Sequence, residues 1–293
     1  MTDSSRRAVV LSGGGLLGAA WQAGLLRGLT EAGVDLAGAD TVIGTSAGSL
    51  SGASFTMGGD PQELLRILDQ AVASVESFVT PERFGRMFEI MAQAAAEDSP
   101  EAGRRRIGQA ALEAETIAEA DFGPKFSFLG EKWPDGFVCT AVEATSGAFQ
   151  AWASGSNVPL FRAVASSCAA PLVFPAVDID GRRYLDGGLN SNLNSELARE
   201  FGRILAVSCL PVTTPVPDAG PMADSMAAQV AAELEERRAA GSQVELIEPG
   251  PEFLDVTDGG RNYMVRANVQ PAFEAGLRQA LGAAQRVSEM WTA

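Results

Sequence analysis

One serine lies in a motif that is typical of a catalytic nucleophile. The segment from Gly44 to Gly48 reads Gly-Thr-Ser-Ala-Gly, and the small residues around Ser46 permit a sharp turn from a strand into a helix. Such a turn exposes the hydroxyl, and the amino end of the following helix stabilises negative charge that develops beside it. A tight turn in which Ser46 only caps that helix would explain the same motif.

A base that activates Ser46 has to be something other than an imidazole, because the chain contains no histidine. This excludes a Ser-His-Asp triad and leaves a buried carboxylate with a raised pKa as the natural proton acceptor. Two Asp-Gly-Gly sites supply candidates: Asp186 follows a predicted strand, and Asp258 follows a weaker strand pattern over 253–257. Asp-Gly is also common in turns, so a turn without catalysis is the alternative at each site.

A run of glycines near the amino end is suited to binding negative charge. Gly13, Gly14 and Gly15 follow the first predicted strand, and consecutive glycines let backbone N–H groups point into one concavity at the start of a helix. The run fits a tight turn, an oxyanion hole or a dinucleotide site, since Gly13, Gly15 and Gly18 match Gly-x-Gly-x-x-Gly. A dinucleotide site also requires an acidic residue at the end of the next strand, where this chain has the Gly-Thr-Ser of the serine motif. The dinucleotide interpretation is weakened, and the other two stay open.

The elements that must position these residues alternate between strands and helices, which is typical of a parallel sheet covered by helices. The predicted strands are 7–12, 41–43, 137–142, 148–152, 172–179, 182–185 and 204–209. The predicted helices are 17–31, 47–56, 160–169, 222–240 and 271–291, with a helix-rich block over 61–120 in which Pro61, Pro81 and Pro100 mark helix starts. No linker or repeat interrupts the pattern, so we expect one domain over residues 1–293.

Composition narrows the classes of partner and environment. The 293-residue chain is 46% hydrophobic, enough for a sizeable core, and its formal charge of −15 argues against nucleic acid as a partner. The three cysteines lie far apart in apolar stretches and are expected to be reduced core residues. The amino end lacks the apolar stretch of a signal sequence and no segment is long enough to span a bilayer, which predicts a cytoplasmic protein.

An apolar stripe lies within the helix-rich block. Its members recur at helical spacing and are Phe84, Met87, Phe88 and Met91. Two interpretations fit this stripe: packing against the core, which we favour, and lining a channel for an acyl chain.

Together, the motifs resemble those of the patatin-like phospholipases, a family of serine lipid acyl hydrolases with an α/β fold. The resemblance lies in the order and spacing of the glycine run, the Ser46 turn, the Ser-x-x-Ala-Pro segment at 167–171 and the strand end at Asp186. It covers about residues 7–56 and 160–209. The block between them and the carboxyl-terminal third carry no diagnostic motif.

The resemblance implies a three-layer α/β/α patatin-like fold with a mainly parallel central sheet. It makes Ser46 the nucleophile and Asp186 the base of a Ser-Asp dyad. The amides of Gly13, Gly14 and Gly15 form the implied oxyanion hole, and no metal or organic cofactor takes part. The implied reaction is hydrolysis of a lipid or fatty-acyl ester through an acyl-enzyme, which allows transient contact with a membrane surface.

The chain departs from the family pattern at one position. Leu17 stands just before the last glycine of the first motif, where the family usually carries Arg or Lys. The glycine loop therefore lacks that positive charge beside the expected oxyanion donors. Two other functions are carried as alternatives: an NAD(P)-dependent oxidoreductase that binds its cofactor at Gly13 to Gly18, and a catalytically inactive lipid-binding module.

Overall fold

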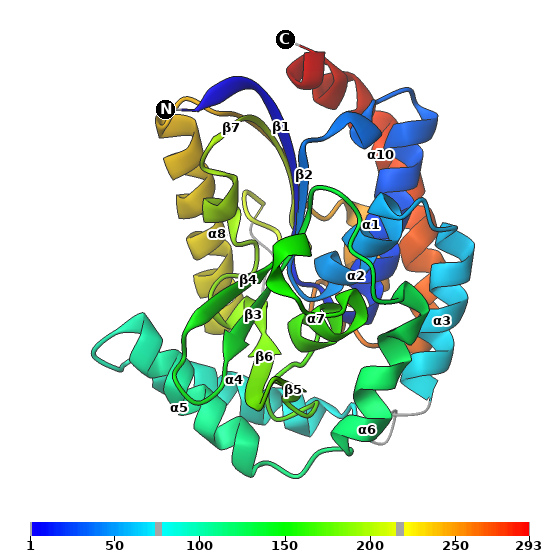
Figure 1. The fold of residues 1–293 in the computed structure, drawn as a ribbon. Coiled ribbons are helices and arrows are strands. Elements are labelled where there is room, and N and C mark those ends of the chain that lie inside the picture. Colours follow the sequence, from blue (N-terminus) through cyan, green and yellow to red (C-terminus); the bar gives the residue numbers. More distant parts are fainter. Residues whose placement is uncertain (1, 74–77, 215–219, 293) are drawn as a thin grey trace.

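The computed structural model describes residues 2–73, 78–214 and 220–292, and within them the strands form one sheet (Figure 1). The strands are β1 (Asp3–Leu11), β2 (Thr41–Gly44), β3 (Phe137–Glu143), β4 (Phe149–Trp152), β5 (Val177–Ile179), β6 (Arg182–Asp186), β7 (Phe201–Val207) and β8 (Gln243–Ile247). The helices are α1 (Gly15–Glu31), α2 (Ala47–Thr56), α3 (Pro61–Ala73), α4 (Pro81–Ala94), α5 (Pro100–Glu113), α6 (Glu119–Phe122), α7 (Leu160–Ser167), α8 (Pro221–Ala239), α9 (Pro251–Val256) and α10 (Val269–Thr292).

The sheet is mainly parallel, as predicted. Its strands follow the order β5-β6-β3-β2-β1-β7-β8, and β4 pairs with β3 outside this row. The pairs from β3 across to β8 are parallel, while β4, β5 and β6 join by antiparallel pairing. Because the carboxyl ends of parallel strands lie at one edge, the turns after β1 and β2 meet there.

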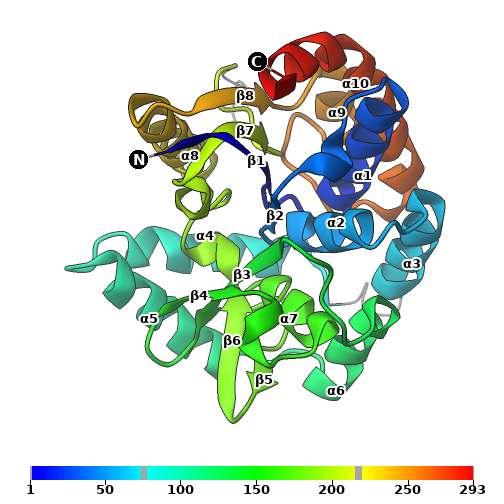
Figure 2. The ribbon, with the colours of Figure 1, turned by 45° about the horizontal axis from the view of Figure 1, so that its top comes forward.

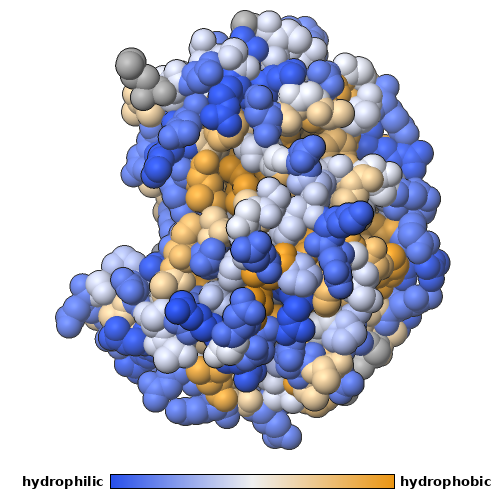
Figure 3. Space-filling view, viewed as in Figure 1, coloured by the Kyte–Doolittle hydropathy of each residue, from blue (hydrophilic) through white to orange (hydrophobic). Residues whose placement is uncertain are grey.

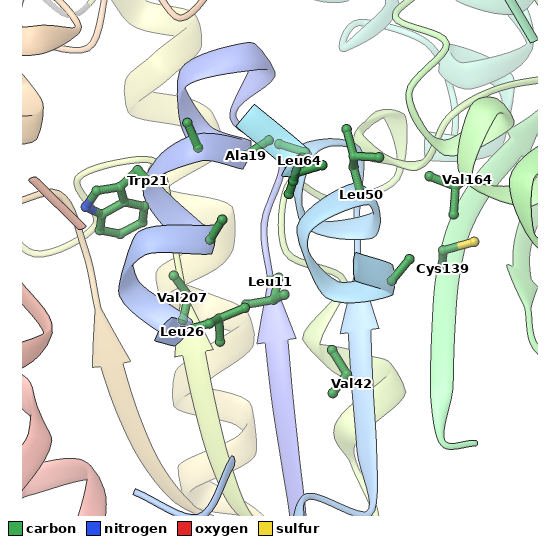
Figure 4. Close-up of a cluster of buried hydrophobic side chains, with 14 of the residues drawn as sticks. Leu11, Ala19, Trp21, Leu26, Val42, Leu50, Leu64, Cys139, Val164 and Val207 are labelled. Atoms are coloured by element: carbon green, nitrogen blue, oxygen red, sulfur yellow. The ribbon is translucent and has the colours of Figure 1, made fainter. Parts of the chain in front are cut away.

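Each face of the sheet has its own apolar layer, because successive residues of a strand point to opposite sides. On one face, Val9 and Leu11 of β1 join the larger core with side chains from α1, α2 and α10. Figure 4 shows part of this layer, including Leu11 and Leu26. On the other face, Ala8 and Val10 pack with residues of α8. Helices therefore cover both faces, in agreement with the expected three-layer α/β/α arrangement.

Two predicted strand patterns need correction, and one strand was missed. Of the predicted strand 172–179, only Val177–Ile179 is a strand (β5). Residues 172–176 instead form a turn, in which Leu172 has a φ of 64° and the Phe174 amide donates to the carbonyl oxygen of Ala170. Residues 253–257, predicted as a weak strand, lie in and just after helix α9, which begins at a proline. Strand β8 was not predicted; it pairs with β7, and its sequence Gln-Val-Glu-Leu-Ile gives a weak pattern.

The helix starts within the 61–120 block are confirmed, since α3, α4 and α5 each begin at the expected proline. Figures 1 and 2 show α4 and α5 side by side, next to β3 and β6 and far from α1 and α10. A small apolar cluster that includes Ile90 of α4, Ala111 of α5 and Leu185 of β6 holds them there. None of the helices in the described ranges has the length and apolarity needed to cross a membrane.

Candidate active site

Ser46 lies on a sharp turn between β2 and α2, with a φ of 53° and a ψ of −116°. A positive φ is uncommon for a residue other than glycine, and such strain is typical of functional sites. The turn needs the flanking glycines, because a Cβ on Gly44 or Gly48 would come within 2.4 Å of backbone atoms. The Ser46 side chain makes no capping hydrogen bond to α2, so the capping alternative does not describe it. The amide of Ala47 at the start of α2 donates to no acceptor among the described residues.

Asp186 lies at the end of β6, where the sequence pattern placed it, and its side chain meets that of Ser46. The residue is only 7% exposed, and its carboxylate accepts a hydrogen bond of 2.8 Å from the amide of Gly188. Burial raises the pKa of Asp186 from 3.8 to about 6, against the opposing effect of hydrogen bonds from the Ser46 side chain and from Gly188. The structure therefore brings a hydroxyl and a carboxylate with a raised pKa together.

Asp258, in the other Asp-Gly-Gly site, has different surroundings. It lies on an exposed turn after α9 with a φ of 53°, and its carboxylate forms an ion pair of 2.8 Å with Arg261. The hydrogen bond from Arg261 lowers the pKa of Asp258. A carboxylate that is exposed and already paired is a poor proton acceptor, so the turn interpretation fits Asp258.

The glycine loop after β1 passes next to Ser46, since a Cβ on Gly13 would lie 3.5 Å from the Ser46 Cβ. The amide of Gly13, however, already donates a 2.9 Å hydrogen bond to the carbonyl oxygen of Asn192. The amides of Gly14 and Gly15 donate to no acceptor within the described ranges. Of the three glycines expected to form an oxyanion hole, Gly14 and Gly15 thus have N–H groups without an acceptor in the described ranges. The N–H group of Gly13 instead holds the loop against Asn192.

The next two amides of α1 are also engaged, by a segment that carries no recognised motif. Leu16 N–H lies 3.4 Å from the sulfur of Met264, and Leu17 N–H donates a 2.9 Å hydrogen bond to the carbonyl oxygen of Tyr263. The Leu17 side chain is fully buried in the core. The position where the family usually has a cation therefore faces the protein interior, and Met264 and Tyr263 are site neighbours that sequence reasoning missed.

The Ser-x-x-Ala-Pro segment packs against the Ser46 turn. The Ser46 amide donates a 3.0 Å hydrogen bond to Ser167 Oγ, and the Cys168 thiol donates to the Ser46 carbonyl oxygen over 3.3 Å. Burial and, to a lesser degree, the charge of Asp186 raise the pKa of Cys168. The other two cysteines are buried and free, as expected, whereas Cys168 is partly exposed beside the dyad candidates.

Helix α4 packs against the apolar cluster that includes the residue before Asp186. Ile90 of α4 and Leu189 both pack against this cluster, which contains Leu172 and Leu185. In the apolar stripe of α4, Met87 is buried, which confirms core packing for that residue, but Phe88 is 40% exposed. On the face of the molecule that Figure 3 shows, which is the face seen in Figure 1, the side chains are largely polar and the apolar ones gather in patches.

Two pockets lie outside this site. One, of about 460 Å³, lies between α1, α2 and the start of α3, and its lining includes Arg27, Glu31 and Asp60. The other, of about 180 Å³, lies around Pro159 and Asp178. Neither lining includes the dyad candidates. In the part of the chain that the structure describes, no group of three or more His, Cys, Asp or Glu side chains is placed to hold a metal ion.

Comparison with known proteins identifies the family. A sequence model of the patatin-like phospholipases matches residues 9–199, more than half of the chain. The crystal structure of VipD from Legionella pneumophila aligns at 13% identity and a TM-score of 0.44, over 96% of this chain and 67% of that chain. The type III effector protein ExoU aligns at 14% identity and a TM-score of 0.36, over 95% of this chain and 54% of that chain. No curated protein gives a significant match. From the match over residues 9–199, the chain belongs to the patatin-like phospholipase family.

Proposed function

We propose that this protein hydrolyses acyl esters of lipids, with Ser46 as the nucleophile and Asp186 as the general base. Membership of the family supports a lipid acyl hydrolase. The observation that carries the assignment of residues is the contact between the Ser46 side chain and the buried carboxylate of Asp186, whose pKa is raised to about 6. A base with a pKa near the working pH is ionised and still basic enough to accept a proton in the transition state.

In the first half of the reaction, Ser46 Oγ attacks the ester carbonyl carbon while its proton passes to Asp186. The carbonyl oxygen becomes an oxyanion, which the free amides of Gly14, Gly15 and Ala47 can stabilise. The tetrahedral intermediate then collapses, the C–O bond to the alcohol breaks, and the alcohol leaves with the proton held by Asp186. This step leaves the acyl group on Ser46 and the carboxylate ionised again.

In the second half, a water molecule gives a proton to Asp186 and attacks the acyl-enzyme carbonyl carbon. The same amides stabilise the second oxyanion, and its collapse breaks the bond to Ser46 Oγ. The proton held by Asp186 returns to that oxygen, and the carboxylic acid is released. Because every proton transfer uses Asp186, the cycle needs no imidazole, in keeping with a chain that contains none.

Two alternative functions are compared with this proposal: a dinucleotide-dependent oxidoreductase and a catalytically inactive lipid-binding module. A dinucleotide site at Gly13 to Gly18 would call for an acidic residue at the end of β2, and that strand ends at Gly44. A catalytically inactive lipid-binding module would bind acyl chains without turnover. The strained Ser46 turn and its carboxylate neighbour favour the hydrolase, since a binding module has no need of either.

A serine-directed fluorophosphonate and p-nitrophenyl esters of graded acyl length test the proposal together. We expect one covalent adduct on Ser46, turnover of the esters by the wild type, and loss of both in Ser46→Ala. Asp186→Asn should abolish turnover, while the matched change Asp258→Asn at the other Asp-Gly-Gly should leave it within about twofold. Lipid binding without an adduct would point to the inactive module, and nicotinamide cofactor binding without an adduct would point to the oxidoreductase.

A further inference from the structure

One buried side-chain amide joins the turn that carries Ser46 to the turn that carries Asp186. Asn194 has no exposed surface. Its Nδ2 donates over 2.9 Å to the hydroxyl oxygen of Thr45, the residue just before Ser46. The same nitrogen lies 3.2 Å from the carbonyl oxygen of Gly187, the residue just after Asp186. A single group therefore contacts the neighbours of both dyad candidates.

A second threonine makes the connection tighter. The hydroxyls of Thr45 and Thr140 lie 2.9 Å apart, and Thr140 Oγ1 is 3.4 Å from the same amide nitrogen. Thr140 is followed in β3 by Ala141, which pairs with Asp186 of β6. A Cβ on Gly187 would lie 2.1 Å from Thr140 Oγ1, so the turn after Asp186 is pressed against this hydroxyl. The spacing of the two turns thus depends on a few buried polar contacts.

Asn194 is itself held firmly in place. The carbonyl oxygen of Ser191 lies 2.7 Å from its Nδ2, which shares its second N–H between this oxygen and that of Gly187. Its Oδ1 accepts a 2.8 Å hydrogen bond from the side chain of Asn190. Its backbone has a φ of 57°, a conformation that asparagine adopts more readily than most residues. The residue at this position therefore needs a side-chain donor, a side-chain acceptor and tolerance of a left-handed backbone. Asparagine meets all three requirements.

We propose that Asn194 is a positioning residue, which holds the Ser46 turn and the Asp186 turn at the separation that proton transfer requires. This inference rests on the proposed function. Asn194 acts through Thr45 and Gly187 and does not itself touch the reacting atoms. Misplacement by about 1 Å can lower a rate by about 100-fold, so a loosened network should reduce turnover even in a folded protein.

The first variant is Asn194→Asp, which keeps the side-chain size, the acceptor for Asn190 and a residue tolerant of the left-handed backbone, but removes the N–H donors. We expect kcat to fall by about 10- to 100-fold and KM to change by less than about twofold, because positioning and not substrate binding is lost. Asn157→Asp is the matched control. Asn157 is exposed, has a φ of 54° and lies outside the site. This control should behave as the wild type.

The second pair of variants tests the same network without a new charge. Thr140→Val removes the hydroxyl at nearly constant shape, whereas Thr140→Ser keeps it. We expect Thr140→Val to lose kcat and Thr140→Ser to recover most of it. In the impaired variants the acid limb of the pH–rate profile should move to higher pH, since a weaker hydrogen bond from Ser46 lets the pKa of Asp186 rise. The titratable neighbour Cys168 stays neutral over this range, because its pKa is raised.

The outcomes separate the two proposals. A wild type that neither turns over esters nor forms an adduct on Ser46 overturns the proposed function and this inference with it. An active wild type with Asn194→Asp or Thr140→Val at wild-type kcat and an unmoved acid limb overturns the positioning proposal alone. If Asn194→Asp fails to show a cooperative thermal unfolding transition, the Thr140→Val and Thr140→Ser pair decides the matter. Equal kcat in that pair counts against the proposal.

Discussion

Replacing Asp186 by Asn should make the protein inactive and, at alkaline pH, more stable. The folded protein raises the pKa of this carboxyl from 3.8 to about 6, mainly through burial. The folded state therefore holds a proton that the unfolded state releases between these values, and stability falls as the pH rises through that window. A difference of about two pH units corresponds to about 3 kcal/mol in the free energy of unfolding.

The Asp186→Asn variant lacks this titration, because a side-chain amide has no proton to release in this range. Between pH 4.5 and pH 8, the wild type should lose about 2 kcal/mol that the Asp186→Asn variant keeps. Urea unfolding of both proteins at the two pH values measures this difference, and the comparison cancels the titration of the other carboxyls. Turnover of a p-nitrophenyl ester should fall by at least about 1,000-fold in the same variant.

Asp258→Asn serves as the control for stability as well as for activity. Asp258 is exposed and its pKa is lowered by Arg261, so the change should bring no gain at alkaline pH. A stability difference between Asp186→Asn and the wild type that is the same at both pH values would refute the raised pKa of Asp186. Ester turnover by Asp186→Asn within about tenfold of the wild type would refute the role of the base.

Three further predictions follow from the site. In the wild type, kcat/KM should rise about tenfold from pH 5 to pH 7 and then level off, since Asp186 with a pKa of about 6 must be ionised; a flat profile over this range contradicts it. Gly14→Ala should lower kcat by about 100-fold or more, because its Cβ would lie 2.4 Å from the sulfur of Cys209 and displace the proposed oxyanion donor; near-normal kcat would count against that donor. Leu17→Arg should lower the free energy of unfolding by more than about 3 kcal/mol, as it buries an unpaired charge, whereas Leu281→Arg at a 70% exposed site should change it little in the same urea titration.

The sequence predicted the residues whose local pattern determines their conformation. The Ser46 turn follows from small residues between a strand and a helix, and the start of α4 follows from Pro81. Asp186 is predicted at a strand end because the strand pattern and the two glycines are adjacent in the chain. These are short-range features, and the fold preserves them.

The parts that could not be predicted depend on contacts between distant segments. The amide of Gly13 is engaged by Asn192, and the first turn of α1 is engaged by Tyr263 and Met264, which no local pattern indicates. Cys168 has the local pattern of any core cysteine, and only the fold places it beside Ser46. An isolated asparagine in the sequence likewise gives no sign that it joins two turns. Such roles are set by tertiary packing.

The close packing of α1 against α10 has a consequence for the timing of folding. A Cβ on Gly24 would lie 2.0 Å from the carbonyl oxygen of Phe273, and one on Gly276 would lie 2.1 Å from that of Trp21, so the two backbones touch. Helix α1, which follows the glycine loop, is thus covered by α10, and α10 leaves the ribosome after the strands of the sheet. A nascent chain can form the strands early, but it acquires a covered α1 only when α10 arrives.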